Sequence, residues 1–368
     1  MKPVISVIVP CYNMSEYLPD CLKSLERQTI GIEKLQIILV DDASTDEGKT
    51  WRLITEFESR YPDSCVAVHL EENRRQGGAM NAGLQYAEGE YIAFAASDDW
   101  VDDDMYRTLY EYAKRRGCDI ADCRMQWEFP DGAGAACSAD SGAACSETRN
   151  AGGADAQEET LITFEKSIME GGAHWITRFC IAEESSMATK LYRRELIIDN
   201  GLSFPEKLRY EDNFLGDIIL LYVKSFCHIS RYLYHYRQHG ESTMHKRNQR
   251  YHFDRLQIEM MKLAKYHELG IAERFHWQIE RDFLNMYYCN TLRIIWGLFD
   301  EPPYEIYLEM VKTVRKLFPD YKENPYLQME NIQTVMLGLI EKDLGREQFL
   351  AAGRMIIEYI NAGTEAEA

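Results

Sequence analysis

The sequence predicts an α/β fold with a mostly parallel sheet flanked by helices, followed by an α-helical C-terminal appendage. The apolar runs 35–40 and 91–96 lack alternation, which is typical of buried strands in a parallel sheet. The first run stops at Asp41-Asp42, and the second leads into Ser97-Asp98-Asp99. Ligands of open α/β sheets bind outside the carboxyl ends of the strands. Two acidic strand ends therefore predict a site for a hard cation and a polyol or nucleotide.

Composition limits the function classes. A chain of 368 residues is long enough for about two domains. Its net charge of -19 argues against a nucleic-acid partner. The ten cysteines lack metal-ligand spacing and are expected to be reduced thiols. We see no signal peptide and no apolar run of roughly 18 residues, so we expect a cytoplasmic protein without a transmembrane helix.

The first third of the chain alternates strands and helices. We expect strands at 4–9, 36–40, 66–70, 90–95 and 120–129. We expect helices at 16–28, 47–61, 77–87 and 102–116, with Ser15 as the N-cap of the first. This order indicates a parallel sheet with right-handed crossovers.

The segment 130–157 differs in composition from its surroundings. It is dense in Ala, Gly, Ser and Asp and contains almost no large apolar residue. Such a composition cannot bury a core, so we predict a flexible insertion. A short ordered excursion is the alternative.

The rest of the chain changes from mixed to helical. We expect strands at 186–192 and 226–236 and helices at 193–200 and 211–223. Five further helices are expected at 251–269, 272–299, 304–318, 329–342 and 347–361. The predicted domains are therefore 1–245 and 246–368.

Several motifs occur in an order that resembles one family. These are Val7 to Asn13, Val40 to Asp46, Asn73 to Gly83, Ser97-Asp98-Asp99 and Tyr210-Glu211-Asp212. Over roughly residues 3–245 the chain resembles bacterial family 2 inverting glycosyltransferases, which have the GT-A fold of nucleotide-diphospho-sugar transferases. The resemblance implies a hexosyltransferase that moves a sugar from a nucleotide-sugar donor, expected to be a UDP-sugar. The implied acceptor is a glycan or lipid-linked glycan in cell-surface or exopolysaccharide synthesis.

The resemblance also implies a donor site. Tyr12 would stack on uracil, although a packing role is the alternative. Asp42 would accept the N3–H of the base, because an ionised carboxylate is an acceptor only. The helix that follows Gly77 would favour a diphosphate at its N-terminus. The full set of implied donor-binding residues is Pro10, Tyr12, Asn13, Asp42, Asn73, Gly77, Gly78, Asn81 and Ser97.

The implied metal and catalytic residues are acidic. Asp98 and Asp99 would hold Mn²⁺ or Mg²⁺, which needs only one or two carboxylates when phosphates and waters complete its coordination. Asp212 would be the general base for the acceptor hydroxyl, with Glu211 assisting. Helix N-capping by this acidic pair is the alternative.

Two positions depart from the family pattern, and they keep other functions open. The family has Asp where this chain has Ala96, and often Arg where it has Met80. A degenerate nucleotide-sugar-binding protein without turnover is therefore the second hypothesis, and a nucleotidyltransferase is the third. Peripheral contact with the inner face of the membrane and a homodimer are left open for the helical tail.

Overall fold

The structure is a computed structural model that describes residues 2–129, 159–175, 186–239, 246–327 and 332–366. Within these residues the chain forms two compact units, the first ending at His239. The insertion expected at 130–157 lies outside the described residues. That residues 1–245 and 246–368 are separate folding domains stays a prediction.

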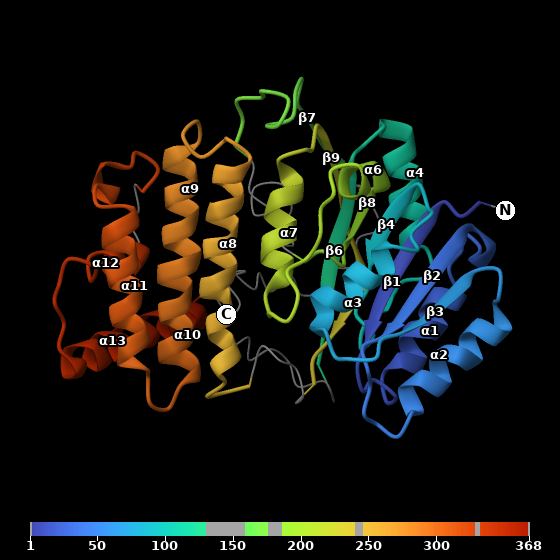
Figure 1. Cartoon of the computed structure of the whole chain (residues 1–368), viewed down its shortest axis with the longest axis horizontal. Coiled ribbons are helices and arrows are strands. Elements are labelled where there is room, and N and C mark those ends of the chain that lie inside the picture. The colour runs from blue at the N-terminus through green and yellow to red at the C-terminus, as the bar shows by residue number, and fades with distance from the viewer. Residues whose placement is uncertain (1, 130–158, 176–185, 240–245, 328–331, 367–368) are drawn as a thin grey trace. The chain divides into compact units, whose positions relative to one another are not determined.

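Four parallel strands form the N-terminal half of the sheet (Figure 1). They are β1 (Ile5–Cys11), β2 (Leu35–Asp41), β3 (Cys65–His69) and β4 (Tyr91–Phe94), in the spatial order β3-β2-β1-β4. Ladder pairing runs to the end of β1 and β2, where Cys11 lies opposite Asp41. The segments that follow β1, β2 and β4 therefore leave the sheet at one edge.

The other half of the sheet is mixed. It contains β5 (Trp100–Val101), β6 (Ile120–Glu128), β7 (Glu159–Thr163), β8 (Lys190–Arg193) and β9 (Ser225–Arg237). β8 lies antiparallel between β4 and β6, whereas β9 runs parallel to β6 and antiparallel to β5 and β7. The predicted strand 226–236 is confirmed, and its end returns to the segment that follows β4.

Helices cover both faces of the sheet. α1 (Leu18–Glu26), α2 (Lys49–Arg60) and α4 (Met105–Arg116) pack on the apolar face that carries Ile5, Val7 and Val9. α3 (Arg75–Leu84) packs on the opposite face of β1 and contacts α7 (Glu211–Leu220). The short helices η1 (Ile32–Lys34) and α6 (Arg194–Ile198) complete the unit.

The first helix begins later than the sequence suggests. Ser15 is not its N-cap, because Met14 accepts backbone hydrogen bonds from Tyr17 and Leu18 and the chain turns before the helix starts. α3 instead begins at Arg75, two residues before the expected start.

The second unit is helical, as predicted. Its elements are η4 (Arg250–Phe253), α8 (Asp254–Glu268), α9 (His276–Phe283), the π-helical η5 (Leu284–Asn290), α10 (Thr291–Leu298), α11 (Tyr304–Leu317), η6 (Tyr321–Glu323), α12 (Ile332–Leu337) and α13 (Arg346–Ala366). Phe349 of α13 is fully buried and stacks on Tyr307 of α11 with ring centroids 4.8 Å apart.

The helix predicted at 329–342 is shorter in the structure, where α12 ends at Leu337. Side chains take over the carbonyl groups beyond this point. The Tyr307 hydroxyl donates to the carbonyl of Leu339, and the Arg315 guanidinium donates to that of Ile340. These tertiary hydrogen bonds stabilise a non-helical turn that local sequence does not reveal.

Close packing of α3 on the sheet depends on Gly83. A Cβ atom at this position would lie 2.5 Å from Ile8 Cγ2 and 3.3 Å from Val40 Cγ2. We predict that Gly83→Ala lowers the free energy of unfolding by about 1–3 kcal/mol through overpacking. Urea denaturation measures this change. The exposed neighbour Gln85→Ala is the control and should stay within about 0.5 kcal/mol of wild type; equal losses in both variants would contradict the packing argument.

Candidate active site

The ends of β1, β2 and β4 meet around the thiol of Cys11. Burial raises the pKa of this thiol well above its ordinary value, and the charges of Asp41 and Asp98 act in the same direction. The side chain of Ser97 hydrogen-bonds to the same thiol. Residues that are far apart in sequence therefore form one polar edge, at the place where the acidic strand ends were predicted to meet.

Tyr12 and Pro10 lie at this edge with different exposures. Pro10 pairs with Val40 within the sheet and is partly buried. Tyr12, just beyond β1, is 41% exposed. The expected stacking role of Tyr12 therefore stays open on geometric grounds.

Asn13 connects the loops that follow β1 and β2. Its backbone N–H donates to Ser44 Oγ at 3.0 Å, its Nδ2 donates to Thr45 Oγ1 at 3.2 Å, and its Oδ1 accepts the Thr45 N–H at 2.7 Å. The amide nitrogen and the amide oxygen of Asn13 are therefore both hydrogen-bonded within the protein. A donor contact by Asn13 would have to compete with this bridge.

The two adjacent carboxylates after β2 have different surroundings. Asp41 is buried, accepts the Ser44 N–H, and lies with Oδ2 2.8 Å from His69 Nδ1, so it supports the loop. Asp42 accepts the backbone N–H of Arg74 at 2.7 Å. Burial raises the pKa of Asp42 to about 6, although this hydrogen bond opposes the shift. Asp42 therefore lies at the start of α3 and is still ionised at neutral pH.

Asn73 completes this connection between β2 and α3. Its Nδ2 donates to the carbonyl of Asp42 at 3.1 Å, and its Oδ1 accepts the Arg75 N–H at 3.2 Å. Arg75 has a positive φ of 60°, so the turn into α3 is a strained conformation for an L-residue. The side chain of Asn73 stabilises that turn.

Arg74 and Asn81 hold the loop before α7. The guanidinium of Arg74 forms a forked ion pair with Glu206, with nitrogen–oxygen distances of 2.6 to 3.1 Å. Asn81 donates to the Phe204 carbonyl and accepts the Phe204 N–H, both at 2.9 Å. Glu206, which the sequence did not single out, thus links α3 to the segment that carries the predicted base.

The glycines of α3 permit close packing against protein. A Cβ atom at Gly77 would lie 2.3 Å from the Pro205 carbonyl and 3.1 Å from Glu211 Cγ. A Cβ atom at Gly78 would meet the Cβ of Arg74 at 2.4 Å. The absent side chain at Gly77 therefore brings the N-termini of α3 and α7 together, and the expected approach of a diphosphate to these glycines stays a prediction.

Asp98 is held by a histidine from the end of the first unit. His239 Nε2 lies 3.0 Å from Asp98 Oδ2, and the His239 ring stacks on Tyr17 with centroids 4.7 Å apart. Within the described residues, no group of three or more His, Cys, Asp or Glu side chains could hold a metal ion. Asp98 and His239 thus place one carboxylate and one imidazole side by side at this edge.

Asp99 points into the protein. It is 2% exposed, accepts the Tyr234 hydroxyl at 2.6 Å, and accepts the backbone N–H of Arg237 at 2.9 Å. Burial raises the pKa of Asp99 to about 8, and the charge of Asp98 adds to this effect. These contacts favour a supporting role beneath Asp98 over the predicted direct contact with a metal.

Glu211 and Asp212 begin α7, where Tyr210 adopts a left-handed conformation with φ of 65°. Glu211 is only 6% exposed, whereas Asp212 is partly accessible. Burial, together with the charge of Asp212, raises the pKa of Glu211 to about 8. At neutral pH the buried Glu211 therefore holds a proton for most of the time.

Met80, which replaces a common arginine of the family pattern, is a core residue here. Its side chain is 4% exposed within α3. It cannot contact a donor without a rearrangement of the helix. Arg74, at the start of α3, is already paired with Glu206.

Arg237 and Glu206 are two contributors to the site that the sequence analysis missed. Arg237 lies 139 residues from Asp98, and Glu206 lies 132 residues from Arg74. An isolated charged residue in a loop or at a strand end carries no local signal of its partner. Only the return of β9 to the β4 edge could have indicated Arg237.

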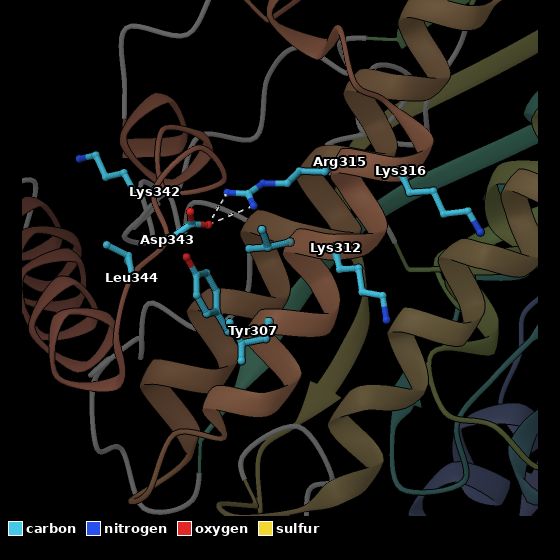
Figure 2. A pocket seen from close by; sticks show the side chains of 9 residues that line it. Tyr307, Lys312, Arg315, Lys316, Lys342, Asp343 and Leu344 are labelled. Atoms are coloured by element: carbon cyan, nitrogen blue, oxygen red, sulfur yellow. Dashed lines mark hydrogen bonds and ion pairs between the residues drawn. The ribbon is translucent and has the colours of Figure 1, made fainter.

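A pocket in the second unit has a different character (Figure 2). This cavity of about 390 Å³ has an apolar wall that includes Leu308 and Val311. Its only carboxylate among the lining residues, Asp343, is paired with Arg315 at 3.1 Å. The side chains of Lys312 and Lys342 extend away from each other in Figure 2. We therefore place the candidate site at the strand ends of the first unit.

Comparison with known proteins agrees with this architecture. Residues 6–136 match the family model described as "Glycosyl transferase family 2". "Putative glycosyltransferase EpsH" of Bacillus subtilis is 29% identical over 251 residues, which cover 66% of this chain and 63% of the relative. "Minor teichoic acid biosynthesis protein GgaB" of the same organism is 37% identical over 107 residues, or 29% of this chain and 12% of the relative. The chain thus spans less than two thirds of these relatives.

A solved structure of Staphylococcus aureus TarS, residues 1–349 in complex with UDP-GlcNAc, has a similar fold. The TM-score is 0.54 at 18% identity, and the similarity covers 98% of this chain and 92% of that one. The predicted class, a GT-A fold of nucleotide-diphospho-sugar transferases with a helical C-terminal part, is thereby confirmed. Residues 6–136, within the N-terminal unit, carry the match to glycosyl transferase family 2.

Two further sequence predictions can be compared with the structure. Among the described residues no helix is both long and apolar enough to span a bilayer. Within the described part of the chain, the cysteines at positions 11, 21, 65, 118, 123, 227 and 289 are buried.

The protonation of Glu211 predicts how stability depends on pH. Its pKa of about 8 in the folded state lies above the ordinary value of 4.5, so the folded chain keeps a proton that the unfolded chain releases between these values. Stability should therefore fall as pH rises through this window. Urea unfolding at pH of about 5 and about 8 should show a smaller fall for Glu211→Gln than for wild type. The exposed Glu88→Gln should behave like wild type, and an unchanged fall in Glu211→Gln would contradict the assignment.

Proposed function

We propose that this protein is an inverting, metal-dependent glycosyltransferase that moves a hexosyl group from a UDP-sugar to a glycan or lipid-linked glycan. The observation that carries the proposal is the convergence of Asp42, Asp98 and the α7 carboxylates around one sheet edge of a family 2 fold. EpsH is named as a putative glycosyltransferase, GgaB as a teichoic acid biosynthesis protein, and TarS was solved with UDP-GlcNAc. These names support a role in cell-surface polysaccharide synthesis, which we expect to take place in the cytoplasm.

The nucleotide would bind between Tyr12 and Asp42. The exposed ring of Tyr12 offers a surface for base stacking. The Asp42 carboxylate, ionised at neutral pH, accepts a hydrogen bond and donates none, which suits the N3–H of uracil. Asp42 already accepts the Arg74 N–H through Oδ1, so Oδ2 is the atom that we assign to the base.

A divalent cation would bind at Asp98. The Asp98 carboxylate and the His239 imidazole would hold it, since Asp98 Oδ2 and His239 Nε2 lie side by side, 3.0 Å apart, at this edge. A buried Nδ1 without a hydrogen-bond partner on His239 leaves the tautomer free to change on metal binding. When bound, such a cation neutralises the charge that develops on the leaving nucleoside diphosphate.

The diphosphate would also meet the start of α3, whose backbone N–H groups and dipole favour an anion. Arg74 contributes positive charge there but is committed to Glu206. Because Met80 is buried, the contact that an arginine would make is lost. The proposed donor site thus relies on the cation and on helix α3.

Proton transfer would be carried by Asp212. An acceptor hydroxyl that attacks the anomeric carbon must lose a proton, and inversion requires a single base. Glu211 is buried and mostly protonated at neutral pH, so it is poorly suited to accept that proton. The more accessible Asp212 is therefore the base, and Glu211 keeps the start of α7 close to Gly77.

A binding protein without turnover is the second candidate. Ala96 in the place of an acidic residue and the buried Met80 favour it, because both remove contacts expected for a donor. The measurement that separates the two candidates is UDP release from UDP-sugars with Mn²⁺ and a mixed acceptor pool. Steady release of UDP together with a glycosylated product supports the enzyme. Binding of the UDP-sugar without release of UDP supports the binding protein.

We predict that Asp212→Asn keeps donor binding and loses transfer. Removal of a general base typically lowers the rate by roughly 100- to 10,000-fold. Calorimetry should give wild-type affinity for UDP with Mn²⁺, and a sugar-transfer assay should give almost no product. Asp217→Asn, farther along α7, is the control and should keep activity. Wild-type transfer by Asp212→Asn would exclude Asp212 as the base.

We further predict that UDP with Mn²⁺ raises the melting temperature more than GDP or ADP with Mn²⁺. A ligand that binds only the folded state stabilises it by mass action, so differential scanning fluorimetry can rank the nucleotides. Asp42→Asn should abolish the preference for UDP because the amide can donate to the base. Asp98→Asn should remove the additional effect of Mn²⁺. Equal stabilisation by GDP would exclude the uridine preference.

A further inference from the structure

Arg237, the last residue of β9, is attached to both residues of the acidic pair that follows β4. Its backbone N–H donates to Asp99 Oδ1 at 2.9 Å. Its side-chain Nε donates to the backbone carbonyl of Asp98 at 2.8 Å. One residue therefore fixes the main chain of Asp98 and the side chain of the next residue.

The guanidinium of Arg237 is itself held firmly. Its Nη2 donates to Asp20 Oδ2 in the first turn of α1 at 2.7 Å. The group lies over the rings of Trp100 and Tyr17, 4.7 and 5.3 Å from their centroids, and the side chain is 23% exposed. A planar guanidinium can stack and donate in several directions at once, which a lysine ammonium cannot do.

The carboxylate of Asp98 is reached from the same strand end. His239, two residues after Arg237, contacts Asp98 Oδ2 at 3.0 Å. Arg237 thus holds the backbone of Asp98 while His239 lies at its carboxylate. Arg237, which packs on the rings of Tyr17 and Trp100, therefore supports the backbone segment that carries the Asp98 carboxylate.

We propose that Arg237 is a positioning residue that aims the Asp98 carboxylate at a divalent cation and its nucleotide diphosphate, without contacting either. This inference rests on the proposed function. Removal of a group that orients a metal ligand typically weakens metal binding by roughly 10- to 100-fold. A purely electrostatic role predicts the reverse, because loss of a cation beside Asp20, Asp98 and Asp99 would strengthen binding of another cation.

The test compares Arg237→Lys with Arg231→Lys. Lysine keeps the charge at 237 but loses the fork and the stacked plane. Arg231 is on the same strand and forms a two-pronged ion pair with Asp104 at 3.0 and 3.2 Å, so its substitution removes a comparable pair at a different place. With UDP saturating, calorimetry should show Mn²⁺ binding weakened roughly 10- to 100-fold in Arg237→Lys and unchanged in Arg231→Lys.

Two more variants keep the test decisive. Asp20→Asn removes only the anchor of Nη2, so it should weaken Mn²⁺ binding less than Arg237→Lys does. The double variant that combines Asp20→Asn with Arg237→Lys should bind Mn²⁺ no more weakly than Arg237→Lys alone, because the two residues act through one contact. Asp20→Asn also carries the test if Arg237→Lys does not fold. Arg237→Gln removes the charge, and tighter Mn²⁺ binding in that variant would overturn the positioning role.

The failures of the inference and of the proposed function are distinguishable. If the melting temperatures of Arg237→Lys and Arg231→Lys fall by the same amount and both variants keep wild-type Mn²⁺ affinity, Arg237 is purely structural and the inference is wrong. If the wild-type protein does not bind Mn²⁺ with UDP, the proposed function fails and the inference fails with it. Weakened Mn²⁺ binding in Arg237→Lys alone supports both.

Discussion

The parallel register of β2, β1 and β4 is the constraint on which the site depends. Because these strands run in one direction and stay paired to their ends, the segments after them leave the sheet at one edge. This register places Asp42 and Asp98 at the same edge of the sheet. Packing maintains it, since the odd-numbered side chains of β1 are fully buried against α1 and α4, and Gly83 allows α3 to lie directly on the opposite face.

Neighbouring buried carboxylates at this edge destabilise the fold through desolvation and mutual repulsion, and hydrogen bonds and cations offset this effect. Asp41 is paired with His69, Asp42 with the start of α3, and Asp99 with Tyr234 and Arg237. Burial nevertheless raises the pKa values of Asp99 and Glu211, and the charges of the neighbouring Asp98 and Asp212 add to this effect. Neighbouring carboxylates thus acquire different protonation states at one pH, a property that acid–base chemistry requires. Asp98 keeps a histidine beside it and is the member of the set best suited to a cation.

Several residues that the sequence pattern would place on the donor also have partners within the protein. Asn13, Asn81 and Gly77 each have a clear partner within the protein, namely the loop after β2, the Phe204 backbone and the Pro205 carbonyl. The contacts of Asn81 and Gly77 join α3 to the segment that leads into α7, and so connect the nucleotide edge with the proposed base. A residue can belong to a family motif because it positions the segment that binds the donor. Motif matching does not distinguish such a residue from one that contacts the donor itself.

The sequence by itself determined the element order of the first unit, the buried strands and the acidic residues at their ends, because these depend on local hydrophobic patterns and on turn chemistry. It also predicted the helical character of the tail. Tertiary structure decided which acidic residue is buried, which one is accessible, and which distant side chain holds each of them. Asp98 and Asp99 are adjacent and chemically identical in sequence, yet one faces the edge with His239 and the other faces Tyr234 inside the protein. That difference arises from the return of β9 over more than a hundred residues, and long-range pairing of this kind leaves no local signal in the sequence.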